Sequence, residues 1–240
     1  MKLSGKNLSF QELNEAVRDT ADEHIELCDI LGHRYIGAGS SGKDIVIEGV
    51  PGNALGAYLS GSSLTVKGNA QDAVGDTMND GRIIISGSCG DTAGYAMRGG
   101  KIYIGGNAGY RVGIHMKEYG AHSPIIVIGG RAGAFLGEYQ AGGTIVVLGL
   151  GGSGCPIGGY CGTGMHGGRM FIRGTVLPGT LSDQVLVEEP DRHSRLLLKE
   201  ILSDYCRYFP EVSANSLLKD HFFLLTPNTK NPFKQLYTAC

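Results

Sequence analysis

The chain has 240 residues, a net charge of −2 and 40 glycines, about twice the glycine share of an average protein. Its 42% hydrophobic content argues against a disordered chain, and the lack of a strict Gly-X-Y triplet excludes collagen. The weak net charge and the lack of a basic run argue against a nucleic-acid partner. The N-terminus has no apolar segment of a signal peptide, and no apolar run is long enough for a transmembrane helix. We therefore expect a cytoplasmic protein that contacts no membrane.

Residues 1–41 precede the regular part of the sequence and are predicted to form a small N-terminal α/β cap. Ser9 and Glu12 have the spacing of a capping box, with Ser9 as the N-cap. A short helix should therefore run from Phe10 to about Asp19. The alternating apolar residues of HIEL, 24–27, predict a strand after it.

Residues 42–174 repeat a unit of 19 residues, and two insertions interrupt the repeat. Each unit contains an aliphatic residue, any residue and then a glycine. The glycines of this pattern are Gly49, Gly68, Gly87, Gly106, Gly130, Gly149 and Gly174, so the steps are 19, 19, 19, 24, 19 and 25 residues. A second series in the same phase is Gly56, Gly75, Gly94, Gly113 and Gly137. The insertions fall near residues 117–121 and 150–155.

Each unit contains a short β-branched segment, such as RIIISG or TIVVLG, which cannot bury a core alone. Stacking equivalent segments in parallel completes their hydrogen bonds and builds one continuous core. The repeat thus predicts an all-β fold, a single-stranded right-handed parallel β-helix, or solenoid, of about six to seven 19-residue coils. An N-terminal cap and a C-terminal helical extension would cover it.

Residues 175–240 have a different composition, because Gly179 is the one glycine among them. Apolar residues recur at spacings of three and four from Arg192 to Phe209, which predicts an amphipathic helix ended by Pro210. This helix would cover the other end or a side of the repeats. The final segment, 222–240, has two prolines and no period, so we expect it to lie extended on a surface.

The hexapeptide GLGGSG, 149–154, follows an apolar strand and has the G-x-G-x-x-G pattern of a dinucleotide-binding loop. Such a loop needs a helix that begins inside the motif and an acidic residue about 20 positions later. Here Pro156 and further glycines follow, and the next repeat stands where the acid should be. We interpret Gly149 as the repeat glycine and the rest as an insertion that projects as a docking point for a partner.

Few residues have the pattern of a chemical site. Cys155 and Cys161 are the one close pair among six cysteines, so a metal site is left open, although small buried thiols explain them better. His115 and His122 flank the first insertion with Glu118 between them, which leaves a small polar site as an alternative.

Other polar residues point to surface positions. His166 is interpreted as a surface turn residue, because the equivalent repeat positions hold unrelated side chains. Aspartates such as Asp72 and Asp91 are interpreted as isolated, which argues against a calcium-binding repeat. We predict no catalytic, cofactor-binding or metal-binding residue in this chain.

The repeats resemble the GXGXG domain family, found as the C-terminal β-helix region of the large subunit of glutamate synthase. The residues that carry the resemblance are the aliphatic-x-glycine series, GNAG at 106–109 and GTGMHGG at 162–168. The helix end YCRYF, 205–209, is similar to the stand-alone, archaeal-type form of this domain. The C component of formylmethanofuran dehydrogenase shares the repeat more distantly.

The resemblance implies a non-catalytic scaffold subunit of a glutamate-synthase-type oxidoreductase complex in nitrogen metabolism. Its partners would be a glutamine amidotransferase subunit and a synthase subunit that holds FMN and an iron–sulfur cluster, while this chain binds no cofactor. A homo-oligomer is left open. Two alternatives remain: an equivalent of the C component in a formylmethanofuran dehydrogenase-type molybdenum or tungsten complex, and an autonomous carbohydrate-acting solenoid.

Overall fold

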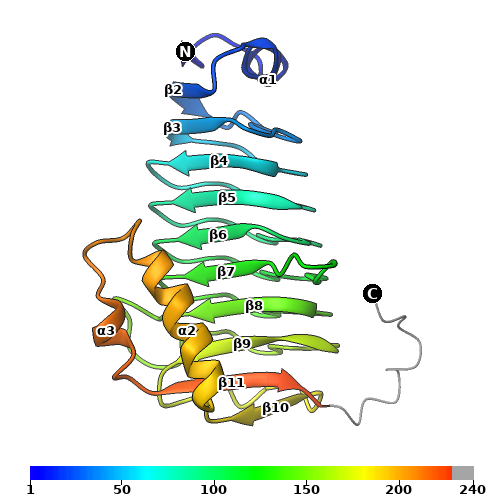
Figure 1. Cartoon of the computed structure of the whole chain (residues 1–240), viewed down its shortest axis with the longest axis vertical. Helices are drawn as coiled ribbons and strands as arrows, with labels where there is room; N and C mark the ends of the chain where they lie inside the picture. Colours follow the sequence, from blue (N-terminus) through cyan, green and yellow to red (C-terminus); the bar gives the residue numbers. More distant parts are fainter. Residues whose placement is uncertain (229–240) are drawn as a thin grey trace.

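The computed structural model describes residues 1–228, and their strands form one sheet of 11 strands. The first nine strands lie in chain order and run parallel, and then β11 and β10 follow as antiparallel neighbours (Figure 1). The strands are β1 (Lys2–Ser4), β2 (His24–Leu31), β3 (Asp44–Val50), β4 (Ser60–Val66), β5 (Asp80–Ile85), β6 (Lys101–Ile104), β7 (Ile125–Ile128), β8 (Ala141–Val147), β9 (Gly167–Arg173), β10 (Val185–Glu188) and β11 (Phe222–Pro227).

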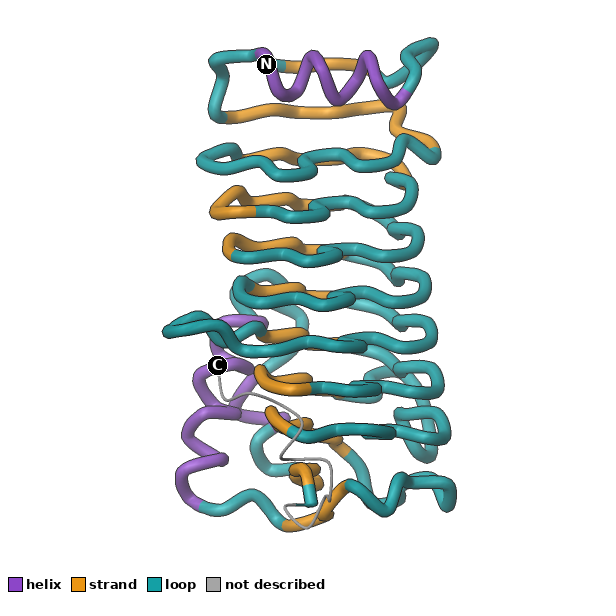
Figure 2. The backbone as a smooth tube through the Cα atoms, turned by 90° about the vertical axis from the view of Figure 1, so that its right-hand side faces the viewer, coloured by secondary structure: helices purple, strands orange, loops and turns teal. Residues whose placement is uncertain are grey.

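Each repeat contributes one strand and one return loop, and the loops stack in the same order as the strands (Figure 2). The register joins equivalent residues, so that Ile83 of β5 pairs with Ile102 of β6 and Ile85 pairs with Ile104. All four side chains are fully buried, because alternate residues of a strand face the loops across the interior. The β-branched segments thus form one continuous core, as their composition predicts.

The return loops reverse direction through left-handed backbone conformations at three alternating positions. In one repeat these are Ala73, Gly75 and Thr77, with φ of 56°, 67° and 52°. The middle position is glycine in each of the seven loops: Gly37, Gly56, Gly75, Gly94, Gly113, Gly137 and Gly162. A Cβ on Gly75 would lie 2.5 Å from Cδ1 of Ile102, so the Ile102 side chain of β6 occupies the space that a side chain at position 75 would need.

The predicted fold class, an all-β right-handed parallel β-helix of six to seven coils, is corrected by this topology. The strands form one open, mixed sheet with edges at β1 and β10, and its last two strands are antiparallel. Left-handed residues prevent the loops from forming strands of their own. Consecutive loops are joined instead by several separate backbone hydrogen bonds, such as Gly75 N to Leu55 O at 2.8 Å and Tyr58 N to Asp76 O at 2.8 Å, and by isolated bridges. The sequence period locates the strands but does not show this loop conformation.

The N-terminal helix is confirmed as α1 (Phe10–Asp19), which lies beside β1 and β2 at one end of the sheet (Figure 1). The capping box is also confirmed: Ser9 Oγ accepts from Glu12 N at 3.2 Å, and Glu12 Oε2 accepts from Ser9 N at 2.8 Å. Leu13 and Val17 pack against the interior core. Because β1 and β2 belong to the same sheet as the repeats, the sheet does not mark a boundary between cap and repeats. The domain boundaries at residues 41 and 174 therefore stay a prediction.

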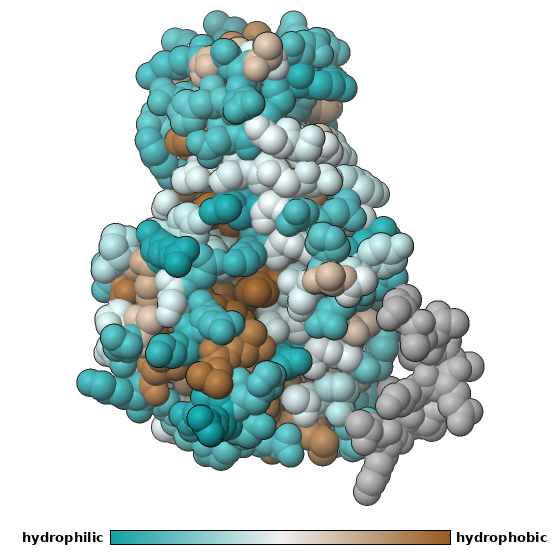
Figure 3. All heavy atoms as spheres, in the orientation of Figure 1, coloured by the Kyte–Doolittle hydropathy of each residue, from teal (hydrophilic) through white to brown (hydrophobic). Residues whose placement is uncertain are grey.

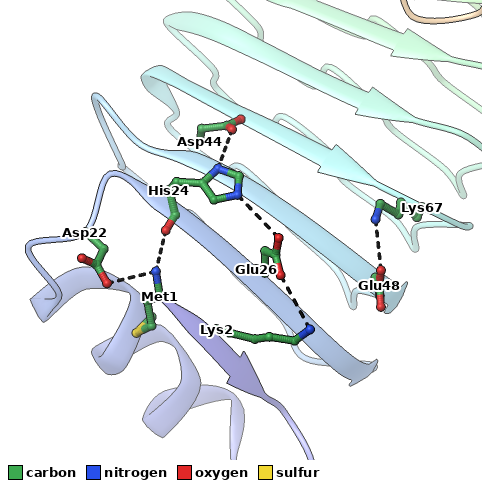
Figure 4. A network of polar contacts seen from close by, with 8 residues as sticks. All are labelled: Met1, Lys2, Asp22, His24, Glu26, Asp44, Glu48 and Lys67. Carbon is green, nitrogen blue, oxygen red and sulfur yellow. Dashed lines mark hydrogen bonds and ion pairs between the residues drawn. The ribbon is translucent and has the colours of Figure 1, made fainter.

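The outer face of the first strands carries a network of charged side chains (Figure 4). His24 Nδ1 lies 2.9 Å from the Asp44 carboxylate, and Lys2 lies 3.7 Å from Glu26. Lys67 binds Glu48 at 3.0 Å one repeat away. These residues are about half exposed, so their pairs contribute little stability, and this part of the face is solvated.

The C-terminal helix α2 (Arg192–Tyr205) lies across the outer face of the sheet (Figure 1). It therefore covers a side of the repeats and not an end, a choice that the sequence left open. Outward residues of β5 to β9 are apolar and form a second core with it: Ile84, Tyr103, Val127, Val146 and Phe171. Asp204 fixes the helix, because its carboxylate accepts from Lys101 Nζ at 2.5 Å and from Tyr103 OH at 2.7 Å. Burial opposes ionisation, but these donors outweigh it and lower the pKa of Asp204.

The end of the sheet beyond β9 is closed by β11 and β10, with α3 (Ala214–Leu217) preceding β11. The extended segment predicted at 222–240 begins as β11, and its residues 229–240 lie outside the described residues. His221 joins the three strands, because Nδ1 lies 2.7 Å from Gly174 O and Nε2 lies 2.7 Å from Glu189 Oε1. The bond to Gly174 and then Glu189 raise the pKa of His221.

Replacing Gly75 by alanine tests the role of the missing Cβ. The left-handed φ and the contact with Ile102 should together lower the free energy of unfolding by about 2–4 kcal/mol. Gly39→Ala is the matched control, because Gly39 has φ of 66° and a Cβ added there would meet nothing within 4 Å. It should cost only about 1 kcal/mol. Urea denaturation measures both, and equal losses would show that the contact with the strand is unimportant.

The His221 contacts predict a pH dependence of stability. A pKa raised in the folded chain means that this contribution is present below the unfolded value of about 6.5 and disappears as pH rises through the folded value. The Tm advantage of the wild type over His221→Gln should therefore shrink between pH 6 and pH 8.5. His122→Gln, at an exposed loop position, should show no such trend. An advantage that grows with pH would contradict the assignment of a protonated imidazole.

Candidate partner-binding surface

The outer positions of the return loops form columns of side chains. In each loop the first and third left-handed residues flank the buried glycine and face away from the core. The first positions are Tyr35, Ala54, Ala73, Thr92, Arg111, Phe135 and Tyr160, and the third positions with side chains are Tyr58, Thr77, Ala96, His115 and Tyr139. Apart from Tyr35 and Tyr58, the residues at these positions are small in the early repeats and large in the later ones.

The later repeats carry a continuous set of stacked side chains, which we call the aromatic face: Tyr95, Arg111, His115, Phe135, Tyr139 and Tyr160. The rings of His115 and Tyr139 stack at 5.2 Å and 7°, and Tyr95 meets His115 edge-on at 5.9 Å. In the neighbouring column Phe135 and Tyr160 stack at 5.1 Å and 13°. The repeat thus places two aromatic stacks side by side on consecutive loops.

Arg111 holds the Phe135 ring of one stack and the neighbouring carboxylate of Glu138. Its guanidinium carbon lies 4.8 Å from the ring centre of Phe135, and its Nε donates to Glu138 Oε2 at 2.8 Å. Glu138 is only 13% exposed, and the guanidinium of Arg111 balances the charge of its carboxylate. Cation–π and ring contacts therefore fix these side chains before any partner arrives.

The aromatic face remains open to solvent although it is ordered. Tyr95, Tyr139 and Tyr160 are 40%, 41% and 54% exposed. Tyrosine, phenylalanine and arginine are enriched at the centres of protein interfaces, where a rigid ring buries a large area at little cost in side-chain entropy. The arrangement is therefore suited to contact with another macromolecule.

A polar ladder runs along the same loops and stabilises the stack. Asn53, Asp72 and Asp91 each accept a hydrogen bond from the backbone N–H one repeat further on, at 3.3, 2.9 and 2.8 Å. The interpretation that these aspartates are isolated is therefore wrong, because Asp72 and Asp91 are one period apart. Their bonds are structural, and residues 1–228 contain no group of three or more His, Cys, Asp or Glu that could hold a metal ion.

The first insertion does not assemble the polar site that its sequence left open. His115 belongs to the aromatic face, while Glu118 Oε1 accepts from Ser123 Oγ at 3.0 Å and from Gly143 N at 3.1 Å. The backbone of His122 pairs with Tyr119 in a tight reversal of the chain. His166 lies in a loop, as expected, with Nδ1 3.0 Å from Gly164 O.

The second insertion is exposed at residues 151–154 but anchored at both sides. Arg131 donates to Ser153 O at 3.0 Å and to Cys155 O at 2.6 Å, and Leu150 packs against the second core. All residues from 149 to 173 are described and none is helical, so the G-x-G-x-x-G lacks the helix that faces a pyrophosphate. A docking role for this loop stays a prediction.

Cys89, Cys155 and Cys161, among the described cysteines, behave as packing residues. Cys161 is fully buried with Sγ 3.7 Å from Met170 Sδ, and burial raises the pKa of its thiol. Cys155 Sγ donates instead to Ile157 O at 3.3 Å. Burial, with Asp72 and Asp91 nearby, raises the pKa of Cys89 to about 12. Thiols of this kind remain protonated and are poor nucleophiles or metal ligands.

Comparison with known proteins is consistent with the repeat. The family described as the GXGXG motif matches residues 25–229. An uncharacterised protein of Methanocaldococcus jannaschii is 41% identical over 98% of this chain and 95% of its own length. The predicted resemblance to this family is thus confirmed.

A solved structure agrees with the more distant resemblance. It is the crystal structure of the formyltransferase/hydrolase complex of Methylorubrum extorquens with methylofuran. Its matching chain is 28% identical, with a TM-score of 0.62 over 83% of this chain and 71% of that chain. Within residues 1–228, the structure contains no helix with the length and apolarity needed to cross a bilayer.

Thiol labelling tests whether the buried cysteines are inert. At pH 8 iodoacetamide should leave Cys89 and Cys161 unlabelled in the folded chain, because both are buried and protonated. The half-buried Cys28 and Cys155 serve as internal controls for reagent access. Mass spectrometry reports each site, and full labelling should appear in 6 M guanidinium. Rapid labelling of Cys161 in the folded chain would contradict the packing role.

Proposed function

Because the chain belongs to the GXGXG family, we propose that it is a non-catalytic subunit that binds partner chains within a larger assembly of the formylmethanofuran dehydrogenase or formyltransferase/hydrolase type. The support for this type of assembly is the solved chain that shares the fold at 28% identity. That chain is part of a complex of several subunits. We place any cofactor of the complex in a partner subunit.

The observation that carries the proposal is the aromatic face. Rings at 40–54% exposure, held by stacking and by Arg111, have the composition of an interface centre rather than of an ordinary solvated surface. They lie on consecutive loops of one sheet-based scaffold, so that a partner meets a preformed surface. Preorganisation lowers the entropic cost of association.

The alternative of an autonomous carbohydrate-acting enzyme is less well supported. Aromatic rings also stack on sugars, but glycoside hydrolysis needs a pair of available carboxyl groups. Glu138, the carboxylate within the aromatic face, is held by Arg111 at 2.8 Å, and Glu118 is bound by Ser123 and Gly143. Both carboxylates are therefore already used in contacts within the chain, and they do not form a catalytic pair.

A glutamate-synthase-type complex is the second candidate, and it rests on the resemblance of the repeats to the β-helix region of glutamate synthase. In that case the partners would be a glutamine amidotransferase subunit and a subunit with FMN and an iron–sulfur cluster. Identification of the co-purified chains separates the two candidates. Molybdenum or tungsten in the isolated complex supports the first, and FMN with glutamine-dependent ammonia release supports the second.

Substitution of the aromatic face tests the proposal. A tagged chain with Phe135→Ala and Tyr139→Ala, expressed in its native cell, should recover partner subunits at least about tenfold less, since each truncated interface residue costs on the order of 1–2 kcal/mol. The matched control is Tyr58→Ala with Tyr119→Ala, which removes two exposed rings elsewhere. Both variants should keep the wild-type Tm within a few degrees. Unchanged recovery with the first variant contradicts the role of the aromatic face.

A further inference from the structure

A groove of about 490 Å³ lies on the outer side of α2, where this helix meets the end of α3 and the start of β11. Its apolar lining is Leu196, Leu198, Leu218 and Phe222. Leu196 is 53% exposed and adds apolar surface to the rim of this groove. Apolar atoms gather along this helix and are surrounded by hydrophilic ones (Figure 3).

Three cationic side chains line the same groove: Arg192, Arg195 and Lys199. They stand at positions i, i+3 and i+7 of α2, so they follow one side of the helix over about 10 Å. Among residues 1–228, Arg192 and Lys199 have no ion pair. Arg195 donates from Nε to Pro190 O at 3.1 Å, and its one ion pair there is a 3.7 Å contact with Glu189, which also binds His221. The groove therefore carries positive charge that the chain itself leaves largely uncompensated.

The position of these cations is unfavourable for the isolated helix. The first turn of α2 contains no acidic residue, although the N-terminal end of a helix carries partial positive charge and favours anions. Asp191 is used as the N-cap, where it accepts from Ser194 N at 2.8 Å. The Asp191 carboxylate offsets part of the helix dipole, so the positive potential at the apolar groove comes mainly from the three cationic side chains, which an anionic ligand would stabilise.

We infer that this groove receives an acidic amphipathic segment of a partner subunit, which is a deepening of the proposed function and rests on it. Apolar side chains of the segment would cover Leu196 and the half-buried Leu218, and its carboxylates would bind the row of cations. Three cations spread over two helical turns match several carboxylates in a row, whereas a single small carboxylate engages one guanidinium. The groove is separate from the aromatic face, which lies on the return loops.

A direct binding assay uses the full chain alone. The probe is a fluorescein-labelled 16-residue helical peptide with leucine on one face and glutamate on the other, and a second peptide has glutamine in place of glutamate. Fluorescence anisotropy should show at least tenfold tighter binding of the glutamate peptide, weakened by added salt. A triple variant, Arg192→Gln, Arg195→Gln and Lys199→Gln, should lose this difference. The control triple, Lys2→Gln, Lys6→Gln and Arg18→Gln, should keep it.

Equal binding of the two peptides, or equal loss in both triple variants, would overturn the inference. Saturable binding of decanoate that depends on the three cations, without binding of the glutamate peptide, would overturn it too and assign the groove to small carboxylates. Because the assay needs no complex, its result is independent of whether partners co-purify. A photo-crosslinker at Leu196 in the isolated complex should then map to an acidic segment of a partner, and a crosslink to a basic or neutral segment counts against it.

Discussion

The structure depends on one close approach, between the middle glycine of each return loop and the side chain of a neighbouring strand. At Gly75, and likewise at Gly56 and Gly113, an isoleucine methyl group occupies the volume that a Cβ would need. The loop can therefore lie directly against the sheet, and repeats stack without a gap in the core. The glycine N–H also bonds to the preceding loop, as Gly75 does to Leu55 O, so that packing and backbone pairing are satisfied at one residue.

This constraint sorts the remaining residues into surfaces. Strand residues that alternate with the core face outward, where they are polar on β2 and β3 and apolar from β5 onward. Only the apolar part is covered by α2, so the helix lies over the later repeats and leaves the charged network of His24 and Asp44 in solvent. On the opposite side, the left-handed residues two positions before and after each glycine face outward, and in the later repeats their columns form most of the aromatic face.

The parts of the fold set by local chemistry could be predicted from the sequence. The strand segments follow from the 19-residue period, and α1 follows from its capping box. The single open sheet could not be predicted, because the left-handed conformation of residues such as Ala73 and Thr77 has no signature in those residue types. The antiparallel pairing of β11 with β9 could not be predicted either, because it joins segments that are distant in the sequence.

The candidate surface was missed for a different reason. Arg111, Phe135 and Tyr160 are 24 and 25 residues apart, so the insertions hide a column that a constant period would reveal. Aligning the units after removing residues 117–121 and 150–155 would bring these side chains into phase.

The chain is proposed to work as one part of a hetero-oligomer. Native mass spectrometry of the untagged protein from its own cells tests it most directly: the account predicts a particle that contains other subunits beside the 25.3 kDa chain, and a mass equal to that chain or its multiples alone would contradict it.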